Sequence, residues 1–196
     1  TSGAALAQDN ASLQTDDKQW VLAGKDYAQT RFSRLDQITP ANAGRLQVAW
    51  TFSVGSNHGQ EAAPLVVNGV MYVEAPGDRV AAYDAVTGEP LWVYNPTLAY
   101  SDLCCGPQAR GVAVAYGKVF VARLDGIMVA LDARTGNVVW KSDPATTLPD
   151  KATRYSFTGA PQVYDGKVVI GSAGAEYPIR GFVQAYDAQT GKLIWR

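Results

Sequence analysis

The chain has 196 residues, of which 47% are hydrophobic, and 17 Lys and Arg against 18 Asp and Glu give it a formal net charge of −1. This composition is typical of a soluble globular protein, and the balanced charge excludes the strongly basic surface that nucleic-acid binding requires. Because no apolar run approaches the roughly 20 residues that a membrane helix needs, the sequence predicts no transmembrane segment.

Residues 1–19 are predicted to form a flexible N-terminus. Ala5-Leu6-Ala7, before Gln8, has the A-x-A form of a signal-peptidase site, although the basic and apolar regions that normally precede such a site are absent. Two interpretations stay open at this point: the remnant of a signal peptide, or an ordinary Ala-rich tail. A signal peptide would place the protein in an oxidising compartment, where disulfides persist.

Internal repeats predict the architecture. The pattern Ala-x-Asp-Ala-x-Thr-Gly-x-x-x-Trp occurs at residues 82–92, 130–140 and 185–195, and residues 38–50 form a degenerate earlier copy. Each copy is typical of a strand, a turn and a second strand, because Asp binds the turn backbone with its side chain and Gly adopts a positive φ.

A second hairpin precedes each full copy, with its turn at Gly69, Gly117 or Gly166. Each unit therefore contains four short strands, and tryptophans recur at positions 50, 92, 140 and 195. Four-stranded units of about 40–50 residues are typical of β-propeller blades. The sequence predicts an all-β partial propeller over residues 20–196, made of N-terminal strands and about three blades.

The repeated tryptophans are expected to pack between neighbouring blades rather than to stack on a ligand, because they recur at one position of every unit. Extra residues in 94–108 and 141–157 lengthen the connections into the next blade. The first strand of a blade lies nearest the propeller axis, so these insertions should gather around one mouth of the channel.

Aligning the units on their turn glycines places three polar side chains at nearly the same depth beside the axis. Glu61 and Thr158 lie eight residues before their glycines, and Arg110 lies seven before its own. Convergent polar groups in a concave apolar scaffold indicate a binding site, and a guanidinium suits carboxylate or phosphate. The alternative is that each side chain only satisfies a loop backbone.

Cys104 and Cys105 are the two cysteines of the chain, and they are adjacent. A disulfide usually joins Cα atoms about 4.4–6.8 Å apart, whereas neighbours are held at about 3.8 Å, so a bond between them would close a strained ring. Such a ring would offer a flat platform for a planar ligand. Two free buried thiols are the other interpretation.

Gly174-Ala175-Glu176 forms a small-residue loop that ends in a carboxylate. Small residues let backbone N–H groups approach a ligand, and the carboxylate could reach a metal held against that ligand. His58 is the single histidine, which argues against a histidine-rich metal site or a Ser-His-Asp triad within this chain. We interpret His58 as a polar loop residue.

From about Trp20 to Arg196 the chain resembles the N-terminal part of pyrroloquinoline-quinone (PQQ)-dependent alcohol dehydrogenases. This quinoprotein group includes methanol dehydrogenase and the quinohaemoprotein alcohol dehydrogenases. The resemblance is carried by Tyr27-Ala28-Gln29-Thr30-Arg31-Phe32-Ser33, Gln60-Glu61-Ala62-Ala63-Pro64, Cys104-Cys105 with Arg110-Gly111, Thr158-Gly159-Ala160-Pro161, Gly174-Ala175-Glu176 and the Trp-ending repeats. Ala109, where Asn is common, and Pro178, where Gly is usual, depart from the family pattern.

The resemblance implies an eight-bladed propeller with PQQ on its axis. It further implies that Cys104 and Cys105 form a disulfide platform under the cofactor, and that Glu176 ligates Ca²⁺ or a lanthanide. The remaining cofactor contacts that it implies are hydrogen bonds from Glu61, Arg110 and Thr158, and backbone contacts at Gly174 and Ala175.

The implied activity is oxidation of an alcohol to an aldehyde or ketone in the periplasm, with a cytochrome as electron acceptor. The resemblance leaves open whether a later domain carries haem c. The catalytic Asp, the second stacking Trp and an Asn metal ligand of the family lie beyond Arg196, so we expect an inactive and poorly stable N-terminal fragment. The alternatives are a non-catalytic Trp-repeat scaffold of the outer-membrane assembly type and a PQQ-dependent sugar dehydrogenase; membrane-bound glucose dehydrogenases characteristically lack adjacent cysteines.

Overall fold

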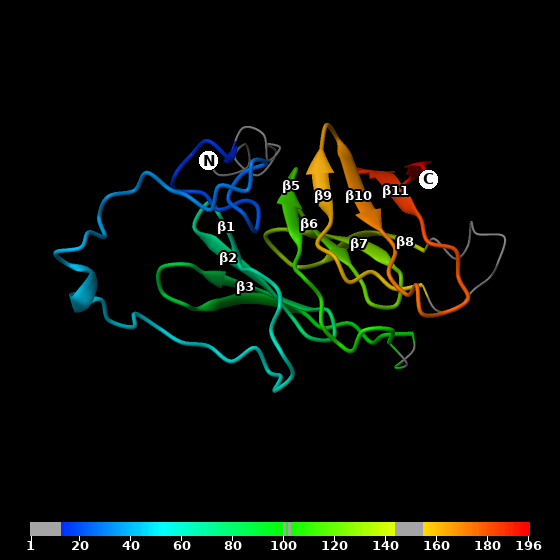
Figure 1. Cartoon of the computed structure of the whole chain (residues 1–196), viewed down its shortest axis with the longest axis horizontal. Coiled ribbons are helices and arrows are strands. Elements are labelled where there is room, and N and C mark those ends of the chain that lie inside the picture. Colours follow the sequence, from blue (N-terminus) through cyan, green and yellow to red (C-terminus); the bar gives the residue numbers. More distant parts are fainter. Residues whose placement is uncertain (1–12, 100, 102, 144–154) are drawn as a thin grey trace.

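The computed structural model describes residues 13–99, 101, 103–143 and 155–196. These residues form three four-stranded antiparallel sheets (Figure 1), each made of four strands consecutive in sequence. The first sheet contains β1 (Leu65–Val67), β2 (Val70–Ala75), β3 (Arg79–Asp84) and β4 (Pro90–Tyr94). The second contains β5 (Ala113–Ala115), β6 (Lys118–Ala122), β7 (Met128–Asp132) and β8 (Val138–Ser142). The third contains β9 (Gln162–Tyr164), β10 (Lys167–Gly171), β11 (Val183–Asp187) and β12 (Leu193–Trp195). The predicted all-β architecture with four-stranded blades is confirmed.

The first hairpin of each blade closes through a two-residue turn in which both residues have positive φ. In the first blade these are Asn68 (φ 51°) and Gly69 (φ 79°), and Val67 pairs directly with Val70. Such turns match the right-handed twist of the flanking strands. The predicted turn glycines therefore set the register of the two inner strands of each blade.

The second predicted turn forms through an aspartate side chain. In the second blade, Asp132 Oδ1 accepts the N–H groups of Arg134 at 3.0 Å and Thr135 at 2.9 Å. Gly136 follows with φ 72°, and its N–H donates to the Asp132 carbonyl at 2.9 Å. Asp84 and Asp187 make the same pairs of side-chain bonds.

The tryptophans that end the first two blades, Trp92 and Trp140, pack against the next blade, as predicted, whereas Trp195 is 44% exposed. A Cβ atom added to Gly136 would lie 2.6 Å from the Trp92 ring, and one added to Gly191 would lie 2.5 Å from the Trp140 ring. Trp92 Nε1 also donates to the Ala133 carbonyl at 3.0 Å. Each of these rings thus covers the turn of the following blade, and glycine there leaves room for it.

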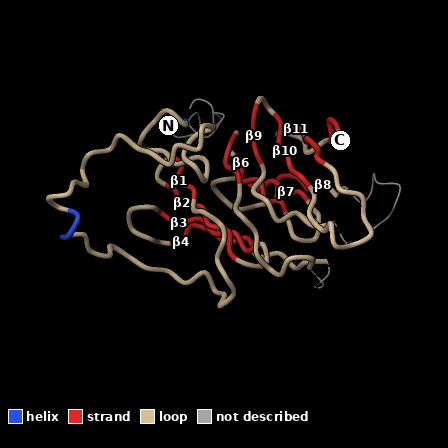
Figure 2. The backbone as a smooth tube through the Cα atoms, in the orientation of Figure 1, coloured by secondary structure: helices blue, strands red, loops and turns tan. Residues whose placement is uncertain are grey.

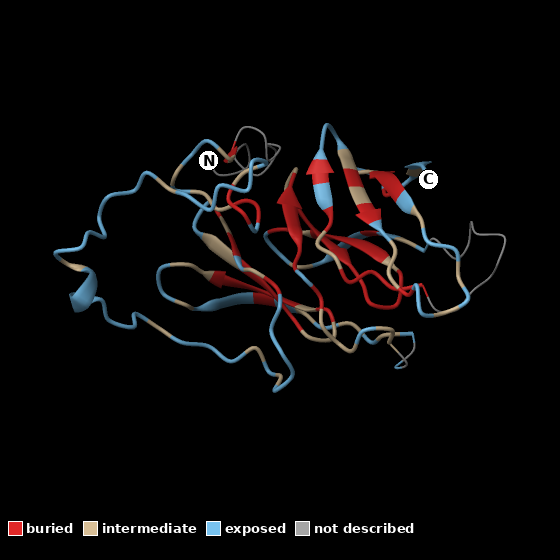
Figure 3. Cartoon of the chain, in the orientation of Figure 1, coloured by how far each residue is buried: buried red, intermediate tan, exposed pale blue. Residues whose placement is uncertain are grey.

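The middle sheet is covered on both faces, because one apolar cluster joins it to the first sheet and another joins it to the third. All five residues of β6 are buried, whereas β9 alternates between exposed and buried positions. Figure 3 shows this difference as continuous red on the central strands. The face of a strand that meets water is therefore decided by blade stacking.

The N-terminal segment packs against the first blade. Trp20 forms an isolated antiparallel bridge with Val66 in β1, and Leu13 belongs to the core between the first two sheets. The Lys25 ammonium group donates to the carbonyls of Gln14 and Asp16 at 2.9 and 2.8 Å. Residues 13–19 of the predicted flexible terminus therefore make defined contacts, and Ala5-Leu6-Ala7 lies outside the described residues.

The degenerate copy at residues 38–50 forms a loop with one short 3₁₀ helix, η2 (Ala43–Arg45), instead of two strands. Figures 1 and 2 show this loop extending away from the sheets. The end of this loop still packs against the first blade. The Trp50 ring covers Gly88, and Phe52 packs on Tyr83 with ring centroids 4.5 Å apart. In the described residues, no helix has the length and apolar character needed to cross a membrane.

Candidate functional site

The structure brings together the three polar residues that precede the inner strands β1, β5 and β9. Arg110 Nε lies 3.4 Å from Glu61 Oε2. The Arg110 backbone N–H and its Nη1 both donate to the Thr158 carbonyl, at 3.0 and 3.3 Å. Three blades therefore contribute to one polar cluster, to which Glu61 and Arg110 bring side chains and Thr158 brings its backbone carbonyl.

This cluster is open to solvent on its charged side. The side chains of Arg110 and Glu61 are 56% and 45% exposed, while Thr158 is buried. An exposed ion pair of this kind contributes about 0–1 kcal/mol to stability. The bonds to the Thr158 carbonyl agree with the alternative interpretation, in which Arg110 satisfies a loop backbone. The guanidinium nevertheless remains accessible to an anionic ligand.

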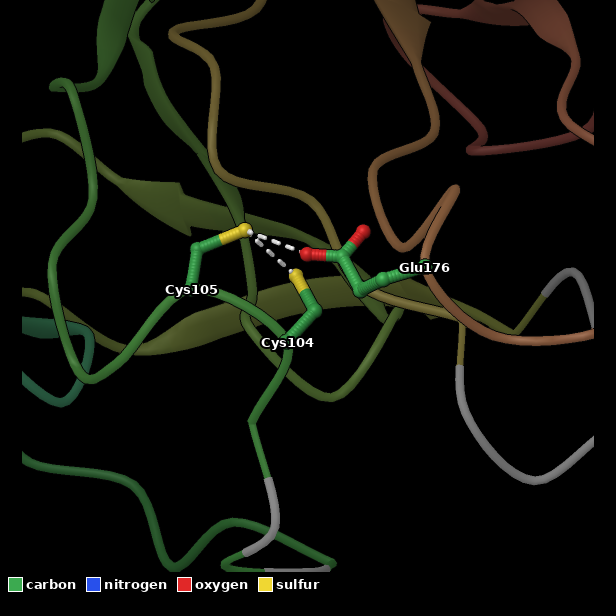
Figure 4. Close-up of side chains that lie close together, drawn as sticks. All are labelled: Cys104, Cys105 and Glu176. Atoms are coloured by element: carbon green, nitrogen blue, oxygen red, sulfur yellow. Dashed lines mark hydrogen bonds between the residues drawn. The ribbon is translucent and has the colours of Figure 1, made fainter.

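The two cysteines lie beside Glu176 (Figure 4), which comes from the loop after β10. Their Sγ atoms are 2.8 Å apart, and Cys105 Sγ lies 3.6 Å from Glu176 Oε1. One donor atom from each of the three residues falls within 4.8 Å of the others. Two adjacent thiols and a carboxylate thus meet at one place, although 71 positions separate Cys105 from Glu176.

Both cysteines are free thiols in the structure, so the disulfide ring stays a prediction. The hydrogen bond with Cys104, together with burial and the nearby Glu176 carboxylate, raises the pKa of Cys105 to about 12. This environment disfavours a thiolate at neutral pH, because a second negative charge would lie beside the carboxylate. A neutral disulfide would avoid that repulsion.

The other predicted site residues occupy loops near these clusters. Gly174 is buried with φ 96°, and Ala175 is exposed beside Glu176. Among the described residues, no hydrogen bond joins either of them to the Arg110 cluster. His58 is an exposed loop residue whose backbone N–H donates to Ser56 Oγ at 3.1 Å, in line with its interpretation as a polar loop residue.

Comparison with known proteins identifies the fold's family. Residues 20–196 match the family model described as "PQQ: Glucose/ethanol/alcohol dehydrogenase, beta-propeller domain". The chain belongs to this family.

Similar PQQ-type propellers include named alcohol dehydrogenases. Quinohemoprotein alcohol dehydrogenase from Comamonas testosteroni is 47% identical over 180 residues, which cover 90% of this chain and 25% of the relative. A crystal structure of that name gives a TM-score of 0.89 at 43% identity and covers 98% of this chain and 29% of its own. The "1-butanol dehydrogenase (cytochrome c)" of Thauera butanivorans is 49% identical over 172 residues, which cover 86% of this chain and 24% of the relative. A "Europium-containing methanol dehydrogenase" gives a TM-score of 0.83 at 39% identity, covering 94% and 32% of the two chains. The chain spans about a quarter of the length of these curated relatives.

This PQQ-type propeller also contains a buried charge cluster that the sequence analysis missed. We call it the seam cluster; it consists of Glu74, Asp78, Arg123 and Asp125, which are all less than 9% exposed. Arg123 forms an ion pair with Asp125, and Asp78 Oδ2 accepts the Leu124 N–H at 2.7 Å. The sequence does contain a signal for this buried cluster, because Glu74 and Arg123 are charged residues that lie at or beside the ends of otherwise apolar strands.

The seam cluster contains three carboxyl groups and one guanidinium. Glu74 Oε1, Asp78 Oδ1 and Asp125 Oδ1 are buried without a hydrogen-bond partner. Burial is the main cause that raises the pKa of Glu74 well above its usual range, and the nearby Asp78 adds to it. Burial likewise raises the pKa of Asp78 to about 7, although its bond from the Leu124 N–H opposes the shift. Both shifts favour the protonated carboxyl over the carboxylate in this seam.

Replacing Asp78 with asparagine is expected to stabilise the protein at alkaline pH. The folded pKa of about 7 lies above the usual pKa of an aspartate in an unfolded chain, so the favourable contribution of the protonated carboxyl is complete below the unfolded pKa and disappears as the pH rises through about 7. Asparagine keeps an acceptor for the Leu124 N–H and cannot ionise. Thermal unfolding at about pH 5 and about pH 8 should show a gain for Asp78→Asn on the order of 1 kcal/mol or more at the higher pH. An equal change at both pH values would contradict this assignment.

Proposed function

We propose that this chain is the cofactor-binding N-terminal part of a PQQ-dependent alcohol dehydrogenase. The observation that carries the proposal is the meeting of the Cys104-Cys105 pair with the Glu176 carboxylate (Figure 4). A planar quinone needs a flat surface to stack on, and a metal that activates it needs a hard oxygen ligand beside that surface. Membership of the PQQ family and the names of the relatives support this combination.

We assign the cofactor contacts as follows. Cys104 and Cys105, joined as a disulfide, would provide the stacking platform. Arg110 would bind a carboxylate of the cofactor, with Glu61 and Thr158 as further hydrogen-bonding partners. The backbone of Gly174 and Ala175 would contact the cofactor beside this platform. Glu176 would ligate the metal ion. The exposed guanidinium suits PQQ electrostatically, because that cofactor carries three carboxylates.

Bound PQQ would supply the redox chemistry by accepting hydride from an alcohol while a metal ion polarises the quinone carbonyl. This chain's residues would hold and orient the cofactor, and we assign no catalytic base among them. Glu176 offers carboxylate oxygens, which Ca²⁺ accepts readily. The europium-containing relative supports a lanthanide as the alternative ion.

The partners and location are proposals of the same kind. We propose a small alcohol as the substrate and a cytochrome as the electron acceptor, in line with the name of the Thauera butanivorans relative. Haem c in a later domain is consistent with the quinohemoprotein relatives. We propose the periplasm as the location, because an oxidising compartment would preserve a disulfide between Cys104 and Cys105.

The test is dye-linked alcohol oxidation by the complete protein, purified without reductant. The protein is incubated with PQQ and Ca²⁺, with PQQ and a lanthanide, or with either metal alone. We expect activity only in the presence of the quinone, and the two metal arms identify the ion. A folded complete protein that takes up no PQQ and oxidises no alcohol in any arm would refute the proposal.

A further inference from the structure

The loop from Cys104 to Gly111 carries both cysteines and Arg110, and the end of the β2–β3 hairpin holds it at two points. The Gly77 N–H donates to the Pro107 carbonyl at 2.7 Å. Glu74 Oε2 accepts the Gly111 N–H at 3.1 Å, across 37 positions of sequence. One hairpin end of the first blade therefore supports the loop that we assign to the cofactor.

The two hydrogen bonds around Arg110 fix its main chain from both sides. Its own N–H donates to the Thr158 carbonyl at 3.0 Å, and the next N–H, that of Gly111, donates to Glu74. Gly111 has φ 120°, a conformation that glycine adopts freely and leaves equally freely. The Glu74 bond thus restrains the peptide between Arg110 and Gly111, and together with the Thr158 bond it fixes the main chain from which the Arg110 side chain extends.

Glu74 is itself a buried residue of strand β2. It is 2% exposed, and its backbone carbonyl accepts Gln60 Nε2 at 2.6 Å. Gly111 is buried as well, so its N–H cannot turn to water if the carboxyl is removed. A buried N–H without a partner carries a desolvation penalty, and a flexible glycine would relieve it by rotating the peptide.

We propose that Glu74 is a positioning residue for the cofactor site, acting through the Gly111 N–H to orient Arg110 and the cysteine loop. The proposal deepens the proposed function and rests on it for the identity of the ligand. Glu74 touches neither Arg110 nor the cysteines through its side chain in any hydrogen bond of the described residues. Its influence on the site passes through the backbone of the loop.

The protonation state of Glu74 suggests the matched variant. Burial raises the pKa of this carboxyl well above its usual range, which favours the neutral acid over the carboxylate. Glutamine has the size of that neutral acid and retains a carbonyl oxygen for the Gly111 N–H. Alanine removes the acceptor altogether.

The experiment compares Glu74→Ala, Glu74→Gln and Asp78→Asn in the complete protein. Asp78→Asn is the control, because it changes a buried carboxyl of the same seam that binds Leu124 rather than the loop. Two readouts are taken: hydrogen–deuterium exchange of peptides spanning residues 104–111 without cofactor, and the dissociation constant of PQQ with Ca²⁺ present. Peptides from β6 and β7 report the stability of the neighbouring blade.

We expect Glu74→Ala to speed exchange in residues 104–111 but not in β6 and β7, and to weaken PQQ binding about tenfold, which corresponds to about 1.4 kcal/mol. Glu74→Gln and Asp78→Asn should stay within about twofold of the unchanged protein in both readouts. Unchanged loop exchange in Glu74→Ala, or an equal loss in Asp78→Asn, would overturn the proposal. If the unchanged protein binds no PQQ, the proposed function fails, while the exchange measurement still decides whether Glu74 orders the loop.

Discussion

Replacing Arg110 with alanine in the complete protein is expected to weaken PQQ binding about 10- to 100-fold, because a charge-assisted hydrogen bond contributes about 1.5–3 kcal/mol. The guanidinium is the one cationic group in the polar cluster formed by Glu61, Arg110 and Thr158, and more than half of its side chain is open to solvent. Titration of the apo protein with PQQ in the presence of Ca²⁺ measures the effect directly.

Two further variants separate charge from geometry. Arg110→Lys keeps the positive charge and loses the planar fork, so we expect an intermediate loss. Arg134→Ala removes an exposed arginine from the turn between β7 and β8 and should leave PQQ affinity unchanged. Equal affinity of Arg110→Ala and the unchanged protein would remove Arg110 from the cofactor site and leave it as a loop-stabilising residue bonded to the Thr158 carbonyl.

Replacing Gly136 with alanine is expected to destabilise the propeller by about 2–5 kcal/mol. The residue has φ 72°, which costs about 1–2 kcal/mol for an L-residue with a side chain. Its new methyl group would also lie 2.6 Å from the Trp92 ring, and overpacking of this kind costs about 1–3 kcal/mol. The thermal unfolding temperature of the complete protein, measured at one fixed scan rate, should fall clearly.

Gly166→Ala provides the matched control. Gly166 has nearly the same φ, 70°, but an added Cβ would meet nothing within 4 Å. Its substitution should therefore show the backbone cost alone. If the two variants lose the same stability, the close packing of Trp92 on the turn contributes nothing measurable, and the repeated Trp–Gly contact would lose its explanation.

Much of the fold could be predicted because its signals are local. The Asp132 side chain accepts hydrogen bonds from the N–H groups two and three positions later. The hairpin turn at Gly69 depends on the positive φ that glycine adopts there. Such interactions depend on a few contiguous residues, so the same short pattern builds the same turn in every blade. The degenerate copy at residues 38–50 lacks that pattern and forms a loop with η2 instead.

The candidate site was predictable only in part. Alignment on the turn glycines brought Glu61, Arg110 and Thr158 to one depth, since equivalent strand positions meet around a common axis. The family resemblance, rather than spacing, connected the cysteine pair with Glu176. No pattern in the sequence connected Glu74 with Gly111, because each lies in a different blade and neither belongs to a repeated motif.

The blades, their turns and the tryptophans that join them follow from the amino-acid sequence, because each depends on backbone preferences and repeated apolar positions within one short segment. Three features follow only from the folded arrangement of the blades: the group of carboxyls that is buried together, the Gly111 N–H that donates to Glu74, and the apolar cover on both faces of the middle sheet. These features depend on how one blade stacks on the next. The electrostatic cost of burying Glu74 and Asp78 exists only once that stacking has excluded water.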